Sequence, residues 1–395
     1  MTTVTRSSRY HIAIFGRRNV GKSSLVNCLA GQAVSIVSCV AGTTTDTVWK
    51  NIELPGVGAA VIADTAGFDD VGELGAMRVD AARKVLARAD VAILLLGECA
   101  DDASLEKEWL AKIREQKLPV IVVAGKCDNE GGAERLAAWQ TALGCDVLPF
   151  SAVTGEGREA LLERIAQQYR QDDDLDDITH SLVKPGDVVV LVMPQDASAP
   201  KGRIIQPQVQ TLRNLLDKHC IPLCCAPEEL PRLLQSLIAP PQLIITDSQV
   251  FAAVERLTPP DTRLTSFSVL MAHHKGDIDA FSCGAQALLA LPPTARVLIA
   301  EACSHIPQNE DIGRVKLPRL LRSKLGDALH IDVVGGNDFP ENLAGYDIVI
   351  HCGACMFNRR TVLSRVRQAK AQGVPITNYG IAIAALTGIL DRVVI

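Results

Sequence analysis

The sequence predicts an α/β protein with three successive domains, each built on a parallel sheet. The chain has 395 residues, which is enough for two or three domains that each bury their own core. Short apolar runs alternate with amphipathic stretches, as in HIAIF, VAILLLG and PVIVVAG near the start and YDIVIHC near the end. Such alternation is typical of strands joined by crossover helices, and these units produce parallel sheets.

Changes in composition divide this pattern into domains. The segment Gln171–Asp177, QDDDLDD, carries like charges that repel one another, and we expect a linker there. The predicted domains are residues 1–172, residues 178–265 and residues 266–395. In the third domain, the runs ARVLIAEAC and YDIVIHCGAC each end a predicted strand in cysteine. Because open parallel sheets usually place their sites at the carboxyl ends of strands, we expect a site there.

The charge and the cysteine content restrict the function classes. The formal net charge is −5, so we expect no basic surface that binds nucleic acid or anionic lipid. No apolar run reaches membrane-spanning length, and the N-terminal residues lack the features of a signal peptide. We therefore expect a cytoplasmic protein. Its 12 cysteines should be mostly reduced, and those at metal-ligand spacing should bind metal.

A phosphate-binding loop lies at the first strand-to-helix turn. The residues Gly16-Arg-Arg-Asn-Val-Gly21-Lys22-Ser23 follow the strand run HIAIF and precede the helical run SSLVNCLA. Glycines let backbone N–H groups approach phosphates, Lys22 should reach the outer phosphates, and the Ser23 hydroxyl should bind Mg2+. The nucleotide-binding residues expected in this loop are Gly16, Asn19, Val20, Gly21, Lys22, Ser23 and Ser24.

Two further segments extend the site toward the terminal phosphate. Asp64-Thr-Ala-Gly67 follows the strand run AAVIA, which puts a carboxylate beside the Mg2+ and a glycine N–H where a terminal phosphate is sensed. The segment Ala41–Asp46 offers several hydroxyls, of which Thr44 is our choice for the Mg2+ shell in the triphosphate state. The predicted Mg2+ ligands are thus Ser23, Thr44 and Asp64.

Guanine recognition is expected from Gly125-Lys-Cys-Asp128, which follows the strand run PVIVVA. Asp128 should accept hydrogen bonds from the base, Lys126 should cover the ring, and Ser151 and Ala152 should form the loop below it. These residues resemble the GTPases of the tRNA-modifying and Era-like branch, in which the motif is usually Asn-Lys-x-Asp. Gly125 replaces the usual Asn of this motif, and the missing Asn side chain is one that strengthens the discrimination of guanine from other bases.

The same resemblance implies how the GTPase turns over. In that branch an Asn matching Asn19 helps hold K+, so stimulation by potassium is expected here. Phe68 follows Gly67, where Ras-like proteins have the glutamine that orients water. Slow hydrolysis is therefore expected, with Glu73 or Asp70 assisting.

Histidine-flanked cysteines in the third domain predict a metal centre. Cys303-Ser-His305 and His351-Cys352-Gly-Ala-Cys355 supply three soft thiolates with adjacent imidazoles, a set that suits iron–sulfur or zinc. A Cys3His zinc site would be closed and structural. A 4Fe-4S cluster on three thiolates would keep one iron for an exchangeable ligand. Each histidine either binds that iron or orients the thiolates as an outer group.

The GTPase motifs together with this cysteine pattern closely resemble the HydF family, the GTPase and iron–sulfur scaffold of FeFe-hydrogenase maturation. The resemblance covers essentially the whole chain and implies a middle domain that dimerises. It also implies a carrier that receives a diiron precursor from the radical-SAM maturases HydE and HydG and delivers it to apo FeFe-hydrogenase. Transferred by motif, the cluster ligands are Cys303, Cys352 and Cys355, with His305 or His351 near the fourth iron. A homodimer, or a tetramer, follows as the expected assembly.

A GTPase of tRNA modification or ribosome assembly with a structural metal site is the alternative function. The first domain supports both functions equally. Beyond the linker, the sequence contains neither a basic RNA-binding face nor a recognisable RNA-binding module, which disfavours the alternative.

Overall fold

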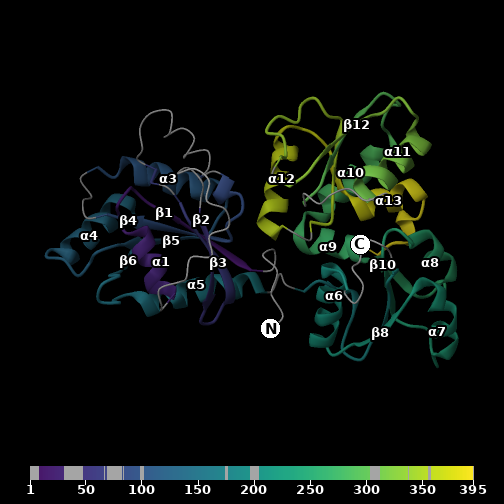
Figure 1. Cartoon of the computed structure of the whole chain (residues 1–395), viewed down its shortest axis with the longest axis horizontal. Coiled ribbons are helices and arrows are strands. Elements are labelled where there is room, and N and C mark those ends of the chain that lie inside the picture. Colours follow the sequence, from purple (N-terminus) through teal and green to yellow (C-terminus); the bar gives the residue numbers. More distant parts are fainter. Residues whose placement is uncertain are drawn as a thin grey trace. The chain divides into compact units, whose positions relative to one another are not determined.

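The structure, a computed structural model, describes residues 9–30, 48–65, 67–68, 82, 84–97, 102–173, 177–195, 204–302, 312–336, 338–354 and 357–394. The chain forms two compact units, residues 1–174 and residues 175–395 (Figure 1). The division falls within the acidic segment predicted as a linker. The last helix of the first unit continues into that segment as far as Asp173, because like charges on a helix cost only a few tenths of a kcal/mol per pair.

The first unit contains a six-stranded sheet in the order β2-β3-β1-β4-β5-β6. Strand β2 is antiparallel to β3, and the other neighbours are parallel. The strands are β1 (Tyr10–Phe15), β2 (Val48–Leu54), β3 (Gly58–Asp64), β4 (Val91–Leu96), β5 (Val120–Ala124) and β6 (Leu148–Pro149). The helices are α1 (Lys22–Ala30), α3 (Ser104–Glu115), α4 (Gly132–Leu143) and α5 (Arg158–Asp173).

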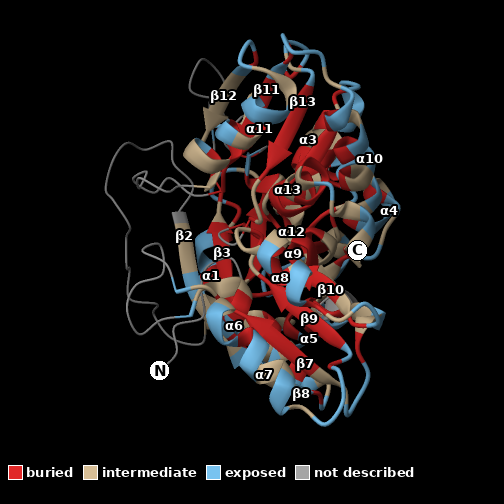
Figure 2. Cartoon of the chain, turned by 90° about the vertical axis from the view of Figure 1, so that its right-hand side faces the viewer, coloured by how far each residue is buried: buried red, intermediate tan, exposed pale blue. Residues whose placement is uncertain are grey.

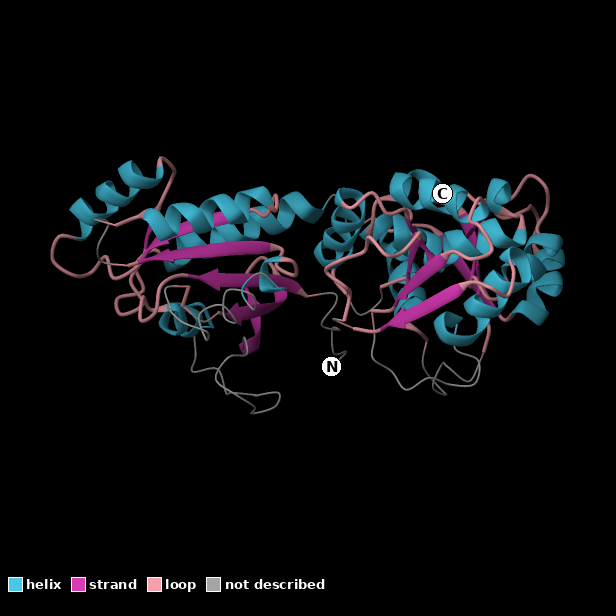
Figure 3. Ribbon diagram, turned by 90° about the horizontal axis from the view of Figure 1, so that it is seen from above, coloured by secondary structure: helices cyan, strands magenta, loops and turns pink. Residues whose placement is uncertain are grey.

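Helices cover both faces of this sheet (Figure 3). Helices α1 and α5 pack on one face, around Leu25, Leu29 and Leu161, and α3 and α4 pack on the other, around Trp109 and Trp139. Strands β1 and β4 are buried along their whole length because both of their faces are covered. Continuous apolar runs such as VAILLL are therefore interior strands.

The second unit contains two four-stranded parallel sheets, in the orders β10-β9-β7-β8 and β12-β11-β13-β14. The first sheet is formed by β7 (Val188–Val192), β8 (Ile221–Cys225), β9 (Leu243–Thr246) and β10 (Arg263–Ser266), with helices α6 (Gln206–Asp217), α7 (Leu230–Ser236) and α8 (Phe251–Leu257). The second sheet is formed by β11 (Arg296–Ala300), β12 (His330–Val334), β13 (Ile348–His351) and β14 (Ile376–Asn378). Its helices are α10 (Ile278–Leu289), α11 (Leu317–Leu325), α12 (Arg359–Ala371) and α13 (Tyr379–Thr387). The predicted α/β class with three parallel-sheet bodies is confirmed.

Helix α9 (Phe267–Lys275) lies between the two sheets of this unit (Figure 1). Its residues Val269 and Ala272 belong to one core with Ile244 of β9 and Val349 of β13. Figure 2 shows that the inner strands β9 and β13 of the two sheets are buried. The C-terminal residues return to the same region, where Val394 N donates to Leu264 O at 2.9 Å. The two sheets therefore share one hydrophobic core.

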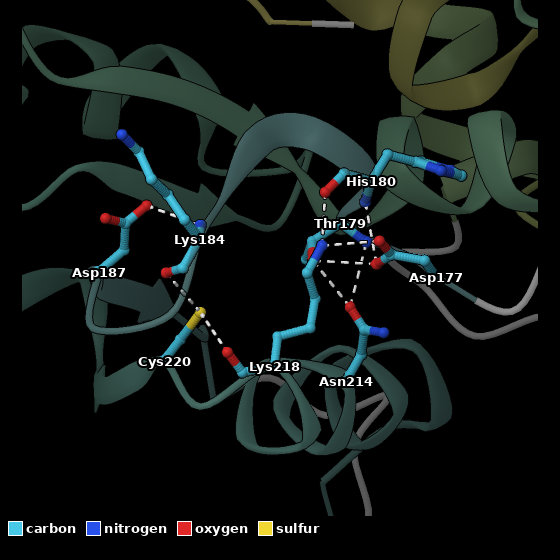
Figure 4. Close-up of polar contacts among 8 residues, drawn as sticks. All are labelled: Asp177, Thr179, His180, Lys184, Asp187, Asn214, Lys218 and Cys220. Atoms are coloured by element: carbon cyan, nitrogen blue, oxygen red, sulfur yellow. Dashed lines mark hydrogen bonds and ion pairs between the residues drawn. The ribbon is translucent and has the colours of Figure 1, made fainter. Parts of the chain in front are cut away.

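A polar network fixes the start of the second unit against α6 (Figure 4). Lys218 Nζ donates to Asp177 Oδ2 at 2.6 Å, and Thr179 Oγ1 donates to Asn214 Oδ1 at 2.8 Å. Burial tends to raise the pKa of Asp177, but hydrogen bonds and charge from Lys218 lower it overall. The network anchors the chain where it leaves the linker segment.

Among the described helices, none is both long enough and apolar enough to cross a membrane.

Candidate functional site

The phosphate-binding loop connects β1 to α1. Asn19 and Gly21 adopt left-handed backbone angles, with φ of 58° and 106°, which turn the chain sharply before the helix. A side chain at Gly16 would place its Cβ 2.5 Å from Leu95 O, so only glycine fits there. Lys22 is buried, and its Nζ donates to Gly16 O at 3.0 Å and to Arg17 O at 2.8 Å. Its ammonium group is thus held by the loop that should receive phosphates.

Two of the three predicted Mg2+ ligands, Ser23 and Asp64, lie side by side. Ser23 Oγ donates to Asp64 Oδ2 at 2.7 Å. This contact arises because β1 and β3 pair in parallel, with Ile14 opposite Asp64, so both strands end at the phosphate loop. Thr65 Oγ1 fixes the next residue by donating to Ile14 O at 2.6 Å. A hydroxyl and a carboxylate at this separation suit a hard divalent cation such as Mg2+.

Helix α3 holds the residue that follows Gly67. The ring of Phe68 is buried and stacks on Trp109 of α3 at a centroid distance of 5.3 Å. Trp109 also stacks on Phe15, at the end of β1, at 5.6 Å. Phe68 is therefore part of the hydrophobic core, and its side chain has no group that could orient a water molecule.

The same helix holds the phosphate loop from outside. Arg17 Nε donates to Glu106 Oε1 at 2.6 Å, and Arg17 Nη2 donates to Glu106 Oε2 at 2.8 Å. Arg17 Nη2 also donates to Asp102 O at 2.6 Å. Glu106 is a carboxylate on α3 with a side chain only 1% exposed, so this is a buried two-pronged ion pair. Sequence reasoning missed Glu106, because no motif marks it.

The predicted guanine-binding residues lie on two neighbouring loops. Lys126 and Asp128 are exposed after β5, and Ser151 and Ala152 follow β6. Cys127 N donates to Phe150 O at 3.2 Å, which joins the two loops. Ser151 Oγ accepts backbone hydrogen bonds from residues 153 and 154 and so shapes its own turn.

Gly125 lies between this base-recognition loop and the phosphate loop. A Cβ at this position would be 3.6 Å from Val20 O and 3.4 Å from Leu96 O, at ordinary or slightly tight contact distances. A polar side chain there would thus reach the phosphate loop, and this chain lacks that tie. Arg135 instead ties the base-recognition loop to helix α4, since its Nη2 donates to Lys126 O at 3.1 Å.

Cys352 directly follows the carboxyl end of β13, beside β11. These strands pair in parallel, with Ala300 opposite His351. Cys352 Sγ accepts hydrogen bonds from Ala302 N at 3.0 Å and from Ala354 N at 3.4 Å. Backbone N–H donors aimed at sulfur favour a thiolate, which is the form that binds metal. Ala302 immediately precedes Cys303 in the chain.

Both ring nitrogens of His351 have partners. Nδ1 lies 2.8 Å from Cys352 O, and Nε2 lies 3.0 Å from Arg365 Nη1. Since Arg365 only donates, Nε2 is assigned as the acceptor and Nδ1 as the donor. Complete burial and the Arg365 charge lower the pKa of His351 to about 3 despite its bond to Cys352 O. His351 is a neutral ring between a buried guanidinium and the Cys352 carbonyl.

Several predicted site residues lie outside the described residues, namely Thr44, Asp70, Glu73, Cys303, His305 and Cys355. Within the described part of the chain, no group of three or more histidine, cysteine, aspartate or glutamate side chains is arranged to hold a metal. Of the predicted cluster set, Cys352 and His351 are therefore the two whose surroundings are defined.

Curated relatives match the N-terminal part of the chain. The GTPase Der of Parvibaculum lavamentivorans is 35% identical over 161 residues, which are 40% of this chain and 34% of Der. The tRNA modification GTPase MnmE of Prochlorococcus marinus is 38% identical over 168 residues, 39% of this chain and 34% of MnmE. The chain thus spans about a third of the length of these relatives.

Solved structures of GTPases also align with the chain. Era from Aquifex aeolicus, in its complex with GDP and AlF4−, aligns with a TM-score of 0.34 and 21% identity, covering 55% of this chain and 92% of Era. The FeoB G-domain from Methanococcus jannaschii aligns with a TM-score of 0.31 and 22% identity, covering 41% of this chain and 98% of that domain.

Three family models match successive parts of the chain. The model of the 50S ribosome-binding GTPase matches residues 11–126, so the chain contains a GTPase domain. The hydrogen maturase F dimerization domain matches residues 178–276, and the hydrogen maturase F tetramerization domain matches residues 279–395. The second unit therefore consists of oligomerization domains. With a GTPase domain followed by both maturase domains, the chain belongs to the hydrogen maturase F (HydF) family.

Proposed function

We propose that this protein is a GTP-hydrolysing scaffold that binds a 4Fe-4S cluster and carries a diiron precursor to apo FeFe-hydrogenase. The cluster ligands in this proposal are Cys303, Cys352 and Cys355. The observation that carries it is the sulfur of Cys352, which accepts two backbone N–H bonds at the ends of adjacent parallel strands. One donor belongs to Ala302, the residue before Cys303 in the sequence.

The chain's own residues have separable tasks at this site. Cys352 supplies a thiolate whose orientation is fixed by its two N–H donors. A bound cuboidal cluster on three thiolates keeps one iron with an exchangeable position, where the diiron cargo could attach. His351 orients the loop rather than binding that iron, because Arg365 and Cys352 O engage its two nitrogens. His305 then remains the candidate for the exchangeable position.

We further infer that GTP hydrolysis is slow and stimulated by potassium. The buried ring of Phe68 supports slow turnover, since Ras-like GTPases have at this sequence position a glutamine that orients water. Exposed Asn19, with its left-handed backbone, supports a K+ site at the phosphate loop. Equal turnover rates in potassium and sodium salts would contradict the K+ site.

The partners in this proposal are the HydE and HydG maturases, the apo-hydrogenase and further copies of the chain, in the cytoplasm. The tRNA-modification alternative gains no support, because the Der and MnmE relatives match only about two fifths of the chain. The hydrogen maturase F models match the remainder, beyond the linker segment.

Iron and sulfide analysis of the anaerobically purified full-length protein tests the proposal. We expect about four irons and four sulfides per chain, the content of one cuboidal cluster. Cys352→Ala should lose the cluster, and Cys283→Ala, at an exposed cysteine of α10, should keep it. Zinc in place of iron, or full iron in the Cys352 variant, would reject the site. A cluster-containing protein that does not activate apo-hydrogenase in the presence of both maturases would reject the carrier role.

A further inference from the structure

Helix α9 ends beside the cysteine loop of the neighbouring sheet. The helix lies within the range matched by the dimerization domain, residues 178–276, whereas Cys352 lies within the range of the tetramerization domain. The first turns of α9 are fixed in the core of the dimerization sheet, where Phe267 and Leu270 pack with Val189 and Leu191. The helix is therefore a rigid connection from one domain to the site of the other.

The last residue of α9 holds the loop directly. Lys275 is only 4% exposed, and its Nζ donates to Ala354 O at 3.1 Å and to Phe357 O at 3.0 Å. These two carbonyls flank Cys355 in the sequence. Burying an ammonium group is unfavourable unless its hydrogen bonds are satisfied, so the contacts with these two carbonyls stabilise the buried charge.

The loop needs such support because its backbone is strained. Ala354 has a φ of 52°, in the left-handed region that residues other than glycine rarely adopt. Its N–H is one of the two donors to Cys352 Sγ, and its carbonyl is one of the two acceptors of Lys275. The lysine therefore stabilises the same peptide geometry that aims an N–H at the thiolate.

A second contact from α9 reaches the other side of Cys352. Ser268 Oγ donates to Asn378 Oδ1 at 3.0 Å, and Asn378 Nδ2 donates to Cys352 O at 3.4 Å. Gly380 N donates to Ser268 Oγ at 3.1 Å, which fixes the hydroxyl. Both sides of the cysteine loop are thus tied to one helix of the dimerization domain.

We propose that Lys275 is a positioning residue of the cluster site, which holds the peptide groups of Ala354 and Phe357 beside Cys352 and, through its buried charge, raises the reduction potential of the bound cluster. This inference rests on the proposed function, because it requires a cluster on these cysteines. A cluster gains negative charge when it is reduced, and a nearby buried cation favours the reduced form. Loss of the charge should therefore shift the potential to more negative values.

The test compares Lys275→Met and Lys275→Arg in the full-length protein, reconstituted anaerobically with iron and sulfide. Lys275→Met should bind less iron per chain, show a changed electron paramagnetic resonance spectrum, and titrate at a more negative potential than the wild type. Lys275→Arg keeps the charge and should restore the potential. Lys370→Met is the matched control, since Lys370 is 54% exposed and pairs with Asp277, and it should match the wild type.

The outcomes separate this inference from the function on which it rests. A wild-type protein that binds no iron and sulfide would reject the proposed function itself. A wild-type cluster together with unchanged iron content and potential in Lys275→Met would reject the role of Lys275 alone. A potential that shifts equally in Lys275→Arg and Lys275→Met would reject the charge effect. If Lys275→Met does not fold, Lys275→Gln, which keeps amide donors but no charge, takes its place with the same expected shift.

Discussion

Replacing Glu106 by glutamine should loosen the phosphate loop. Glu106 accepts two hydrogen bonds from Arg17, and its carboxylate is almost completely buried. Breaking a buried ion pair outright costs about 3–5 kcal/mol. Here the cost is lower, because the amide still accepts one bond, Arg17 keeps Asp102 O, and Arg17 is 32% exposed to water. We expect the free energy of unfolding to fall by about 1.5–3 kcal/mol, the contribution of a charge-assisted hydrogen bond.

Part of this loss should appear in nucleotide binding. Arg17 O accepts a hydrogen bond from Lys22 Nζ, so a displaced Arg17 also displaces the lysine that should meet the phosphates. If half of the loss falls on the binding-competent loop, the binding free energy weakens by about 0.75–1.5 kcal/mol, which is about a 3.5- to 12-fold rise in Kd. A fluorescence titration with a labelled GTP analogue measures the Kd, and urea denaturation measures the stability.

Glu108→Gln on the same helix is the matched control. Glu108 pairs with Lys112 one turn later, is 54% exposed, and should contribute only about 0.3–0.5 kcal/mol. Equal Kd values and equal denaturation midpoints for the two variants would refute the role assigned to Glu106. A stability loss without any change in Kd would confine that role to packing of α3.

Three further predictions concern other parts of the chain. Lys22→Ala should abolish GTP hydrolysis with an unchanged circular dichroism spectrum, because the phosphates lose their cation; full turnover would contradict this. Burial and the facing charges lower the pKa of both His180 and His273, whose rings lie 3.9 Å apart, so the folded state keeps them neutral. Stability should then be highest above pH 6.5 and decline as the pH falls below it, and His273→Phe should make the urea midpoints less dependent on pH in this acidic range. Ile221→Asp, on the 53% exposed start of edge strand β8, should weaken self-association in sedimentation velocity, and an unchanged dimer would show that this edge is not the interface.

Much of the fold could be predicted from the sequence because the interior strands are unbroken apolar runs. The edge strand β2, with the sequence VWKNIEL, was not recognised, since it mixes polar and apolar residues. A turn signal was present, because Gly56 lies between β2 and β3 and has a φ of 75°. The end of α5 also differed from the expected linker start, since repulsion between like charges on a helix is too weak to end it at residue 171.

Only part of the candidate site could be predicted from the sequence. Residues that should contact phosphate could be predicted, because their spacing on a strand, turn and helix is fixed by the nucleotide. Two roles for His351 remained open in the sequence, and only its contacts with Arg365 and Cys352 O distinguish ligation from orientation. Arg365 is 14 residues away on another element, so spacing along the chain could not reveal this pair.

The residues that sequence reasoning missed share one physical task. Glu106 holds the phosphate loop through Arg17, Arg135 holds Lys126 O of the base-recognition loop, and Lys275 holds carbonyls of the cysteine loop. A motif records groups that contact a ligand, whereas these side chains contact the backbone or the flank of a motif. Since the targets of Arg135 and Lys275 are peptide carbonyls, which every residue has, no particular sequence pattern is required at the target. Their substitution should therefore change an affinity or a potential while binding persists, whereas substitution of a ligand residue such as Cys352 should abolish binding.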